Sequence, residues 1–138
     1  MLYVTDADLL PPSDMFRVRV LDKANTAIIR LLVDNQVVHE FLIEQWMSFC
    51  KILDKFIVPV LYRPSTPLQM CFDLPESRKG FAFYKPFLPQ YSTLYFPDSA
   101  FLMNYVQLFY LLKVRENVTN DMLTILERQA RKFSTCRL

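Results

Sequence analysis

Glycine, histidine and closely spaced cysteines are scarce in this chain of 138 residues, which has one glycine, Gly80, and one histidine, His39. A single glycine cannot form the glycine-rich loops that hold the phosphates of nucleotides, so we expect no site of that kind. The three cysteines, Cys50, Cys71 and Cys136, are odd in number and contain no C-x-x-C pair. We therefore expect reduced thiols in an intracellular protein, cytoplasmic or nuclear, with no metal site and no cofactor.

The sequence also lacks a secretory signal and a long apolar run. Residues 1–14 carry acids and prolines where a signal peptide needs a basic and then an apolar start. The most apolar stretch, residues 101–112, is too short to cross a bilayer and contains Asn104 and Gln107. We therefore predict a soluble protein without a membrane partner, in which this stretch forms a buried helix.

The composition indicates one folded domain over residues 1–138. Hydrophobic residues make up 52% of the chain and charged residues 22%, which is typical of a globular protein and not of a disordered one. The net charge is only +2, whereas a domain dedicated to duplex DNA is strongly basic. The composition therefore argues against a dedicated duplex-DNA binder but permits a local basic patch.

Alternating and β-branched segments predict strands in the first half of the chain. In FRVRVLD, residues 16–22, the apolar side chains share one face and two arginines share the other. A helix with one polar stripe is expected from Glu44, and Pro59 is expected to stop it. The strands expected before this helix are Leu2–Thr5, 16–22, 26–34 and 36–43.

The second half is expected to repeat this order. Pro86 indicates that one of its strands is an edge strand or is bulged. The sequence Pro-Asp-Ser at 97–99 suits the first turn of a buried helix, and a last helix is expected over residues 119–133, capped at its first or second residue. The strands expected in this half are 60–64, 68–75, 80–87 and 91–96.

The two halves correspond at an offset of 54 residues, which relates Glu44 to Asp98 at the starts of the two expected helices. The predicted fold is therefore α+β, with antiparallel sheets in two pseudo-repeated β-β-β-β-α units at about 2–57 and 58–114, plus the C-terminal helix. Each sheet is expected to bury one face under its own helix, with the helices packed together. The alternative is a coincidence of spacing, which any α+β protein of this size can show.

The doubled order over residues 2–114 resembles the Whirly family of single-stranded DNA-binding proteins. Residues 42–46, LIEQW, also resemble the strand-to-helix corner of related transcriptional coactivators, which use one β-β-β-β-α unit per chain in a dimer. The chain lacks the Lys-Gly-Lys-Ala-Ala type of motif that Whirly proteins carry. The resemblance therefore implies a fold and a class of partner, single-stranded nucleic acid, but it assigns no binding residue.

Few residues have a pattern that indicates catalysis. His39 alternates with Val37 and Phe41 on a predicted strand, which favours a structural role. A nucleophilic pair of Cys50 with His39 is the alternative, but Cys50 lies on the apolar face of a predicted helix, where a buried thiol is expected. The aspartates fall in predicted turns and caps. We therefore predict that the protein is not an enzyme.

Basic and aromatic residues lie together in several predicted strands. Cations interspersed with aromatic side chains can follow a phosphate backbone and stack unpaired bases. The alternative is that the aromatic side chains form the core and the cations form a solvated rim. The candidate residues for binding single-stranded DNA or RNA are Arg17, Arg19, Arg30, Arg63, Lys79, Phe83 and Lys85.

The sequence leaves two functions open. The high apolar content, and a strand such as AIIRLLV that is apolar on both faces, favour a protein-interaction subunit or adaptor in an oligomer or larger complex. The alternative is a module that binds single-stranded DNA or RNA. Because nucleic-acid binding favours a charge above +2, we predict the interaction subunit first, with a protein partner or a homo-oligomer.

Overall fold

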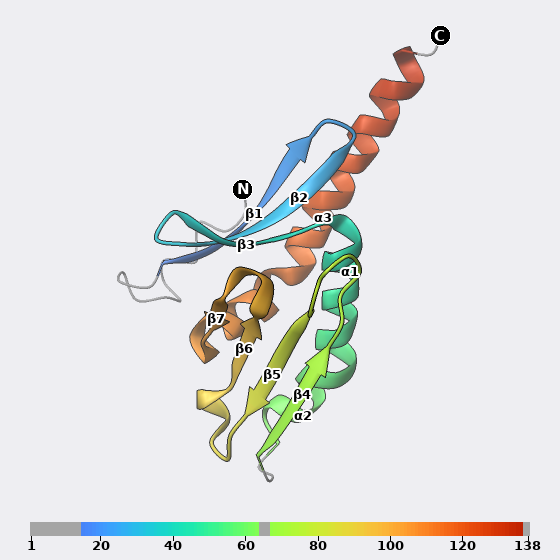
Figure 1. The fold of residues 1–138 in the computed structure, drawn as a ribbon. Helices are drawn as coiled ribbons and strands as arrows, with labels where there is room; N and C mark the ends of the chain where they lie inside the picture. Colours follow the sequence, from blue (N-terminus) through green and yellow to red (C-terminus); the bar gives the residue numbers. More distant parts are fainter. Residues whose placement is uncertain (1–14, 64–66, 137–138) are drawn as a thin grey trace.

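The computed structural model describes residues 15–63 and 67–136, with side chains up to residue 132. These residues form two antiparallel sheets packed against long helices (Figure 1). The predicted strand Leu2–Thr5 lies outside the described residues. In chain order the elements are β1 (Phe16–Lys23), β2 (Thr26–Val33), β3 (Gln36–Phe41), α1 (Ile43–Ile52), η3 (Leu53–Ile57), α2 (Val58–Leu61), β4 (Leu68–Phe72), β5 (Phe81–Lys85), η4 (Pro89–Tyr91), β6 (Thr93–Phe96), η5 (Pro97–Ser99), β7 (Phe101–Met103) and α3 (Tyr105–Cys136).

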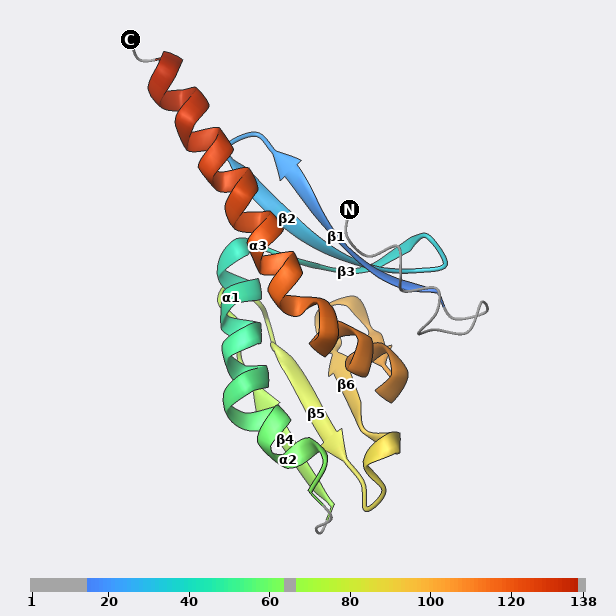
Figure 2. The ribbon, with the colours of Figure 1, turned by 180° about the vertical axis from the view of Figure 1, so that it is seen from behind.

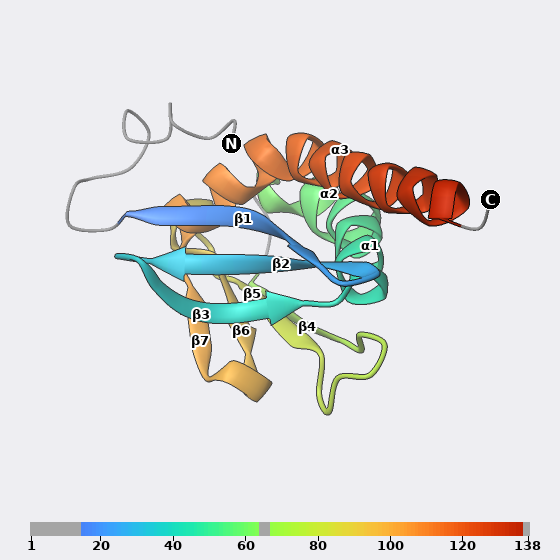
Figure 3. The same ribbon diagram turned by 90° about the horizontal axis from the view of Figure 1, so that it is seen from above.

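The first sheet, sheet 1, has the order β1-β2-β3 (Figure 3). The predicted alternation is confirmed, because Phe16 and Val18 are fully buried while Arg19 is exposed. The predicted turn between β2 and β3 is confirmed as well, with Asp34 and Asn35 both at positive φ, a conformation that Asp and Asn tolerate better than most residues. The third strand ends at residue 41, two residues earlier than expected.

The helix after sheet 1 does not stop at Pro59, so that prediction is wrong. It continues through the π-helical segment η3 and then α2, which ends at Leu61. The N–H of Val58 donates to the carbonyl of Leu53, five residues back. This wider turn relieves the clash that a proline ring makes with the preceding turn of an ordinary α-helix. Because residues 60 and 61 are helical, the strand predicted at 60–64 is wrong too.

The second sheet, sheet 2, has the order β4-β5-β6-β7. A helix was predicted to open at 97–99, and the strand β7 lies where the next residues of that helix were expected. Residues 97–99 form only the short 3₁₀ segment η5, and Ala100 follows at φ 50, in the left-handed region, which reverses the chain into β7. The strand β5 pairs on both sides and ends before Pro86, so the prediction of an edge or bulged strand is also wrong.

One long helix, α3, replaces the two helices predicted after residue 100. Its N-terminus is capped by Asn104 and Gln107, each side chain accepting the backbone N–H of the other residue. Thr119 and Asn120, the two candidate caps of a separate last helix, both lie inside α3, where the hydroxyl of Thr119 donates to the carbonyl of Arg115. Residues 115–118 contain no glycine or proline, so no local signal ends the helix there.

The α+β class, the antiparallel sheets and the C-terminal helix are confirmed. The offset of 54 residues relates β1–β3 to β4–β6, but β7 then intervenes before α3. The two long helices begin at Ile43 and Tyr105, which are 62 residues apart, and Asp98 lies in η5 rather than at a helix start. The predicted correspondence of Glu44 with Asp98 therefore fails.

The helices α1 and α3 lie side by side behind the sheets (Figure 2). The indole Nε1 of Trp46 on α1 donates to the hydroxyl of Thr119 on α3 at 2.9 Å. Closer to solvent, the guanidinium of Arg115 pairs with the carboxylate of Asp54 at 2.8 Å. These contacts hold the two helices together, so the inner faces of both sheets are covered and their outer faces remain toward solvent.

Gly80 supports the turn from β4 into β5, and we predict that Gly80→Ala destabilises the fold. Gly80 has φ +66, and an added Cβ would lie 1.8 Å from the carbonyl oxygen of Phe72. Strain and clash together should lower the free energy of unfolding by about 2 kcal/mol or more, as measured by denaturant titration. The control is Ala100→Gly, which should leave stability unchanged or raise it by up to about 1 kcal/mol. Equal stability of Gly80→Ala and the parent chain would contradict this account of the turn.

Candidate functional site

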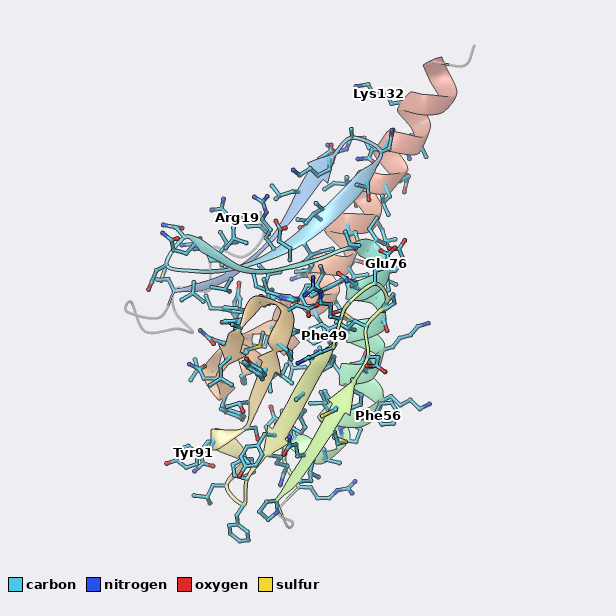
Figure 4. All side chains as sticks on the ribbon, viewed as in Figure 1. Arg19, Phe49, Phe56, Glu76, Tyr91 and Lys132 are labelled. Carbon is cyan, nitrogen blue, oxygen red and sulfur yellow. The ribbon has the colours of Figure 1, made fainter. Side chains whose placement is uncertain are left out.

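Three of the predicted binding residues come together on the outer face of sheet 1. Arg17 and Arg19 extend from β1, and Arg30 lies directly opposite Arg19 on β2. Arg30 forms an ion pair with Glu40 of β3, which neutralises part of the positive charge. Figure 4 shows Arg19 on this sheet, remote from Tyr91 at the far end of sheet 2. The arginine cluster therefore lies apart from the exposed aromatic side chains.

Two further predicted residues lie outside both sheets. Arg63 follows α2, and Lys79 lies in the connection from β4 to β5. Both side chains are exposed, but neither extends from a strand. They therefore do not join the arginines of sheet 1 in one continuous binding surface.

Phe83 and Lys85, the remaining predicted residues, face the interior. Both side chains are fully buried, because residues 81, 83 and 85 of β5 share the inner face of sheet 2. The ammonium of Lys85 has no hydrogen-bond partner among the described residues, and the same holds for the hydroxyl of Ser92. Neither Phe83 nor Lys85 is available to a ligand on the outer face.

The outer face of sheet 2 is uncharged and rich in exposed apolar area. Tyr84 is 46% exposed, Tyr95 42% and Leu102 57%, and these fractions are large for side chains on paired strands. Tyr95 lies between Ala82 and Leu102 in the register of the sheet. We call this surface the sheet-2 face, and its residues are Gln69, Cys71, Ala82, Tyr84, Thr93, Tyr95 and Leu102.

Exposed aromatic residues continue beyond the strands. Phe87 is 65% exposed and Tyr91 is 64% exposed, and both lie in the connection from β5 to β6. Sequence reasoning missed this surface because it treated the aromatic residues of β5 as one group. Strict alternation along β5 separates Tyr84 from Phe83 and Lys85, and it was the signal that could have found the sheet-2 face.

A cavity of about 390 Å³ lies where the edge of sheet 1 meets sheet 2. We call it the corner cavity. It is lined by residues 37–40 of β3, by Gln45 of α1, by Leu74 and Ser77 of the β4–β5 connection, and by Asp98 and Ser99 of η5.

His39 connects β3 to the floor of this cavity. Its Nδ1 lies 2.7 Å from the hydroxyl of Ser99, and its ring packs against Phe41 and Phe96 with centroids 4.6 and 4.3 Å away. Burial lowers the pKa of His39 to about 4, although the charges of Asp98 and Glu40 act in the opposite direction. A neutral imidazole in a hydrogen bond to a turn residue fits the structural role predicted for His39.

Asp98 is one of two exposed acids that line the corner cavity, the other being Glu40. The Oδ2 of Asp98 accepts hydrogen bonds from the hydroxyl of Ser77 at 2.6 Å and from the backbone N–H of Arg78 at 3.1 Å. The bond from Ser77 is the main reason why the pKa of Asp98 lies below its usual value. The carboxylate therefore stays ionised at neutral pH.

Cys50 and His39 are not brought together. The thiol of Cys50 contacts Thr119 between α1 and α3, and burial raises its pKa to about 12. Within the described ranges, no group of three His, Cys, Asp or Glu side chains is placed to hold a metal ion. In the same part of the chain, no helix has the length and apolar character to cross a membrane.

Comparison with protein-family models, with curated proteins and with solved structures finds no match for this chain.

The buried state of His39 gives a prediction for pH dependence. The pKa of His39 is about 4 in the folded protein against 6.5 for an unperturbed histidine. As the pH falls, the histidine of the unfolded chain therefore takes up its proton at a higher pH than that of the folded chain. Stability should therefore be highest above pH 6.5 and fall as the pH drops toward 4, by at most about 3 kcal/mol from this residue. Denaturant titrations at several pH values measure the effect.

The matched control is His39→Gln, which keeps a hydrogen-bonding group near Ser99 but does not titrate. The difference in unfolding free energy between the parent chain and this variant should shrink as the pH falls below 6.5. A difference that stays constant between pH 6.5 and 4 would show that His39 titrates alike in the folded and unfolded chains.

Proposed function

We propose that this protein is a non-enzymatic interaction subunit of the cytoplasm or nucleus, and that it associates through the sheet-2 face. The observation that carries the proposal is an exposed β-sheet surface that has tyrosines and a leucine, and no charged side chain among the strand residues that face outward. Contiguous apolar surface of this kind marks sites of protein association more often than free surface.

A second copy of the same chain is the partner that this face fits best. A surface without charge can meet its own copy without like-charge repulsion, and Tyr84 and Tyr95 supply large side chains that lose little entropy on binding. A homo-oligomer also agrees with the net charge of +2, which is low for a protein that binds nucleic acid strongly.

We also propose that the two halves are structural repeats of β-β-β-β-α type, as in the Whirly-like arrangement. The support is that each half supplies one antiparallel sheet and one long helix, and that the two helices lie side by side (Figure 2). In this proposal the repeat offset is longer than 54 residues, because it equals the spacing between the first residues of the two helices.

Binding of single-stranded DNA or RNA is the second candidate function. The specific observation in its favour is the group of Arg17, Arg19 and Arg30 on one exposed face, with Arg19 opposite Arg30. Its weakness is that this face carries no aromatic side chain on β1 or β2 on which a base can stack. It therefore ranks below self-association.

We predict that Tyr84→Ser combined with Tyr95→Ser strongly weakens self-association. Removing both rings from the centre of the sheet-2 face should weaken association at least tenfold, about 1.4 kcal/mol. Sedimentation equilibrium should then report an oligomer for the parent chain and a monomer for the variant. The control is Leu123→Ser on α3, which removes a side chain that is 50% exposed but lies outside the sheet-2 face. A parent chain that is monomeric at every concentration contradicts the proposal.

The second candidate is tested with a labelled single-stranded oligonucleotide. Under the proposed function, fluorescence anisotropy should show no binding tighter than tens of micromolar in physiological salt. Tighter binding that the triple variant Arg17→Ala, Arg19→Ala, Arg30→Ala abolishes would favour nucleic-acid binding instead. In that case the three arginines contact phosphates, and their loss should also reduce the slope of log K for the oligonucleotide against log salt concentration, by about 0.7 per contact. The control variant is Arg63→Ala with Lys79→Ala.

A further inference from the structure

The corner cavity follows the open edge of a β-strand. Sheet 1 has the order β1-β2-β3, so β3 pairs with β2 on one side, and no described strand pairs with its other side. Residues 37–40 of β3 line the cavity in succession. An edge strand presents unpaired N–H and C=O groups at alternate residues, which makes it a template for an added strand.

The opposite wall of the cavity supplies an acid with a free oxygen. The Oδ2 of Asp98 accepts the bonds from Ser77 and Arg78, while no described residue donates a hydrogen bond to its Oδ1. Glu40, the other acid that lines the cavity, is already paired with Arg30. Asp98 is thus the group that can select a cationic side chain, even though the charge of Arg78 acts on it as well.

We propose that the corner cavity binds an extended peptide segment of a partner protein, which adds as a strand to the edge of β3 and places a lysine or arginine on Asp98. Backbone hydrogen bonds along an open edge give such a complex its affinity, and pockets for alternate side chains give it specificity. The four residues of β3 that line the cavity span about 10 Å at the rise of a strand, which suits a segment of four or five residues.

A β-bulge limits where the peptide can pair. The register between β2 and β3 shifts between Leu31 and Leu32, which leaves Val38 as the extra residue. A bulge bends its strand and interrupts regular pairing. The peptide should therefore lie along His39 and Glu40, with its backbone hydrogen bonds to the one of these two residues whose N–H and C=O point away from β2, and pack its apolar side chains against Val37 and Val38.

This inference deepens the proposed function, because it names a second kind of partner for an interaction subunit. It uses a different surface, however, and so the two can fail separately. The variant with Tyr84→Ser and Tyr95→Ser should lose self-association but bind the peptide as the parent chain does. Loss of peptide binding alone would leave self-association through the sheet-2 face intact.

The probe is a fluorescein-labelled hexapeptide, Thr-Val-Lys-Val-Thr-Val, titrated by anisotropy, with amide shifts followed by NMR. We expect a Kd of about 10–100 µM, in the range of a short peptide that pays its own ordering cost. The amide signals of residues 37–40 should shift on binding. Asp98→Asn should weaken binding at least fivefold, whereas it should not change the binding of a peptide with norleucine in place of lysine.

N-methylated peptides test the strand pairing without altering the protein. Methyl groups on the backbone nitrogens of the three valines, or of the other three residues, block opposite edges of the peptide. One of these two peptides should lose binding at least tenfold, and the other should keep it. Equal effects of both, or no binding of the parent peptide, would overturn the proposal.

Competition between the peptide and self-association gives the last outcome. If the peptide dissociates the oligomer, the edge of β3 belongs to an interface between copies of this chain. The proposal of a separate peptide partner is then wrong. An oligomer that persists in saturating peptide supports it.

Discussion

The shared core depends on one buried ring, Phe49 of α1. Phe49 stacks on Phe41 of sheet 1 with centroids 4.9 Å apart and meets Phe81 of sheet 2 edge to face at 5.0 Å. It also packs against Phe96, which itself contacts Phe41 and Phe81. Since aromatic pairs contribute beyond the area they bury, this cluster joins the two sheets into one unit. Both inner faces are used in doing so, so a partner can reach a sheet only at its outer face or its open edge.

The two outer faces differ in chemistry, and that difference orders the functional proposals. Sheet 1 presents Arg17, Arg19 and Arg30 without aromatic side chains on β1 and β2, whereas sheet 2 presents Tyr84 and Tyr95 without charge. A surface for single-stranded nucleic acid needs cations and stacking rings within reach of one strand. A surface for protein association needs apolar area free of unpaired charge. The separation of the two kinds of residue therefore favours association, with the corner cavity between the sheets as a second, more polar contact point.

Much of the fold could be predicted from alternation, and several of the errors arose at prolines. The strands β1 and β2, and the turn at Asp34 and Asn35, follow from period-two patterning and from residues that tolerate positive φ. Pro59 and the proline at position 97 predict a helix stop and a helix start, and the structure differs at both places. The segment η3 carries the helix past Pro59, and Ala100, in the left-handed region, ends the turn that follows the proline at position 97.

For the candidate site, strict alternation would have assigned Lys85 to the core and Tyr84 to the surface. Nothing in the local sequence predicts that the corner cavity forms, because its walls come from four separate segments.

The most direct test of the central claim is the reactivity of Cys71, which is exposed on the sheet-2 face beside Ala82. Cys136→Ser removes a second thiol, and burial keeps the pKa of Cys50 at about 12, so that labelling by N-ethylmaleimide reports on Cys71. If a second copy covers this face, the labelling rate should fall several-fold as the protein concentration rises from micromolar toward millimolar, and Tyr84→Ser with Tyr95→Ser should restore the fast rate. A labelling rate of Cys71 that is the same at all concentrations would contradict the account.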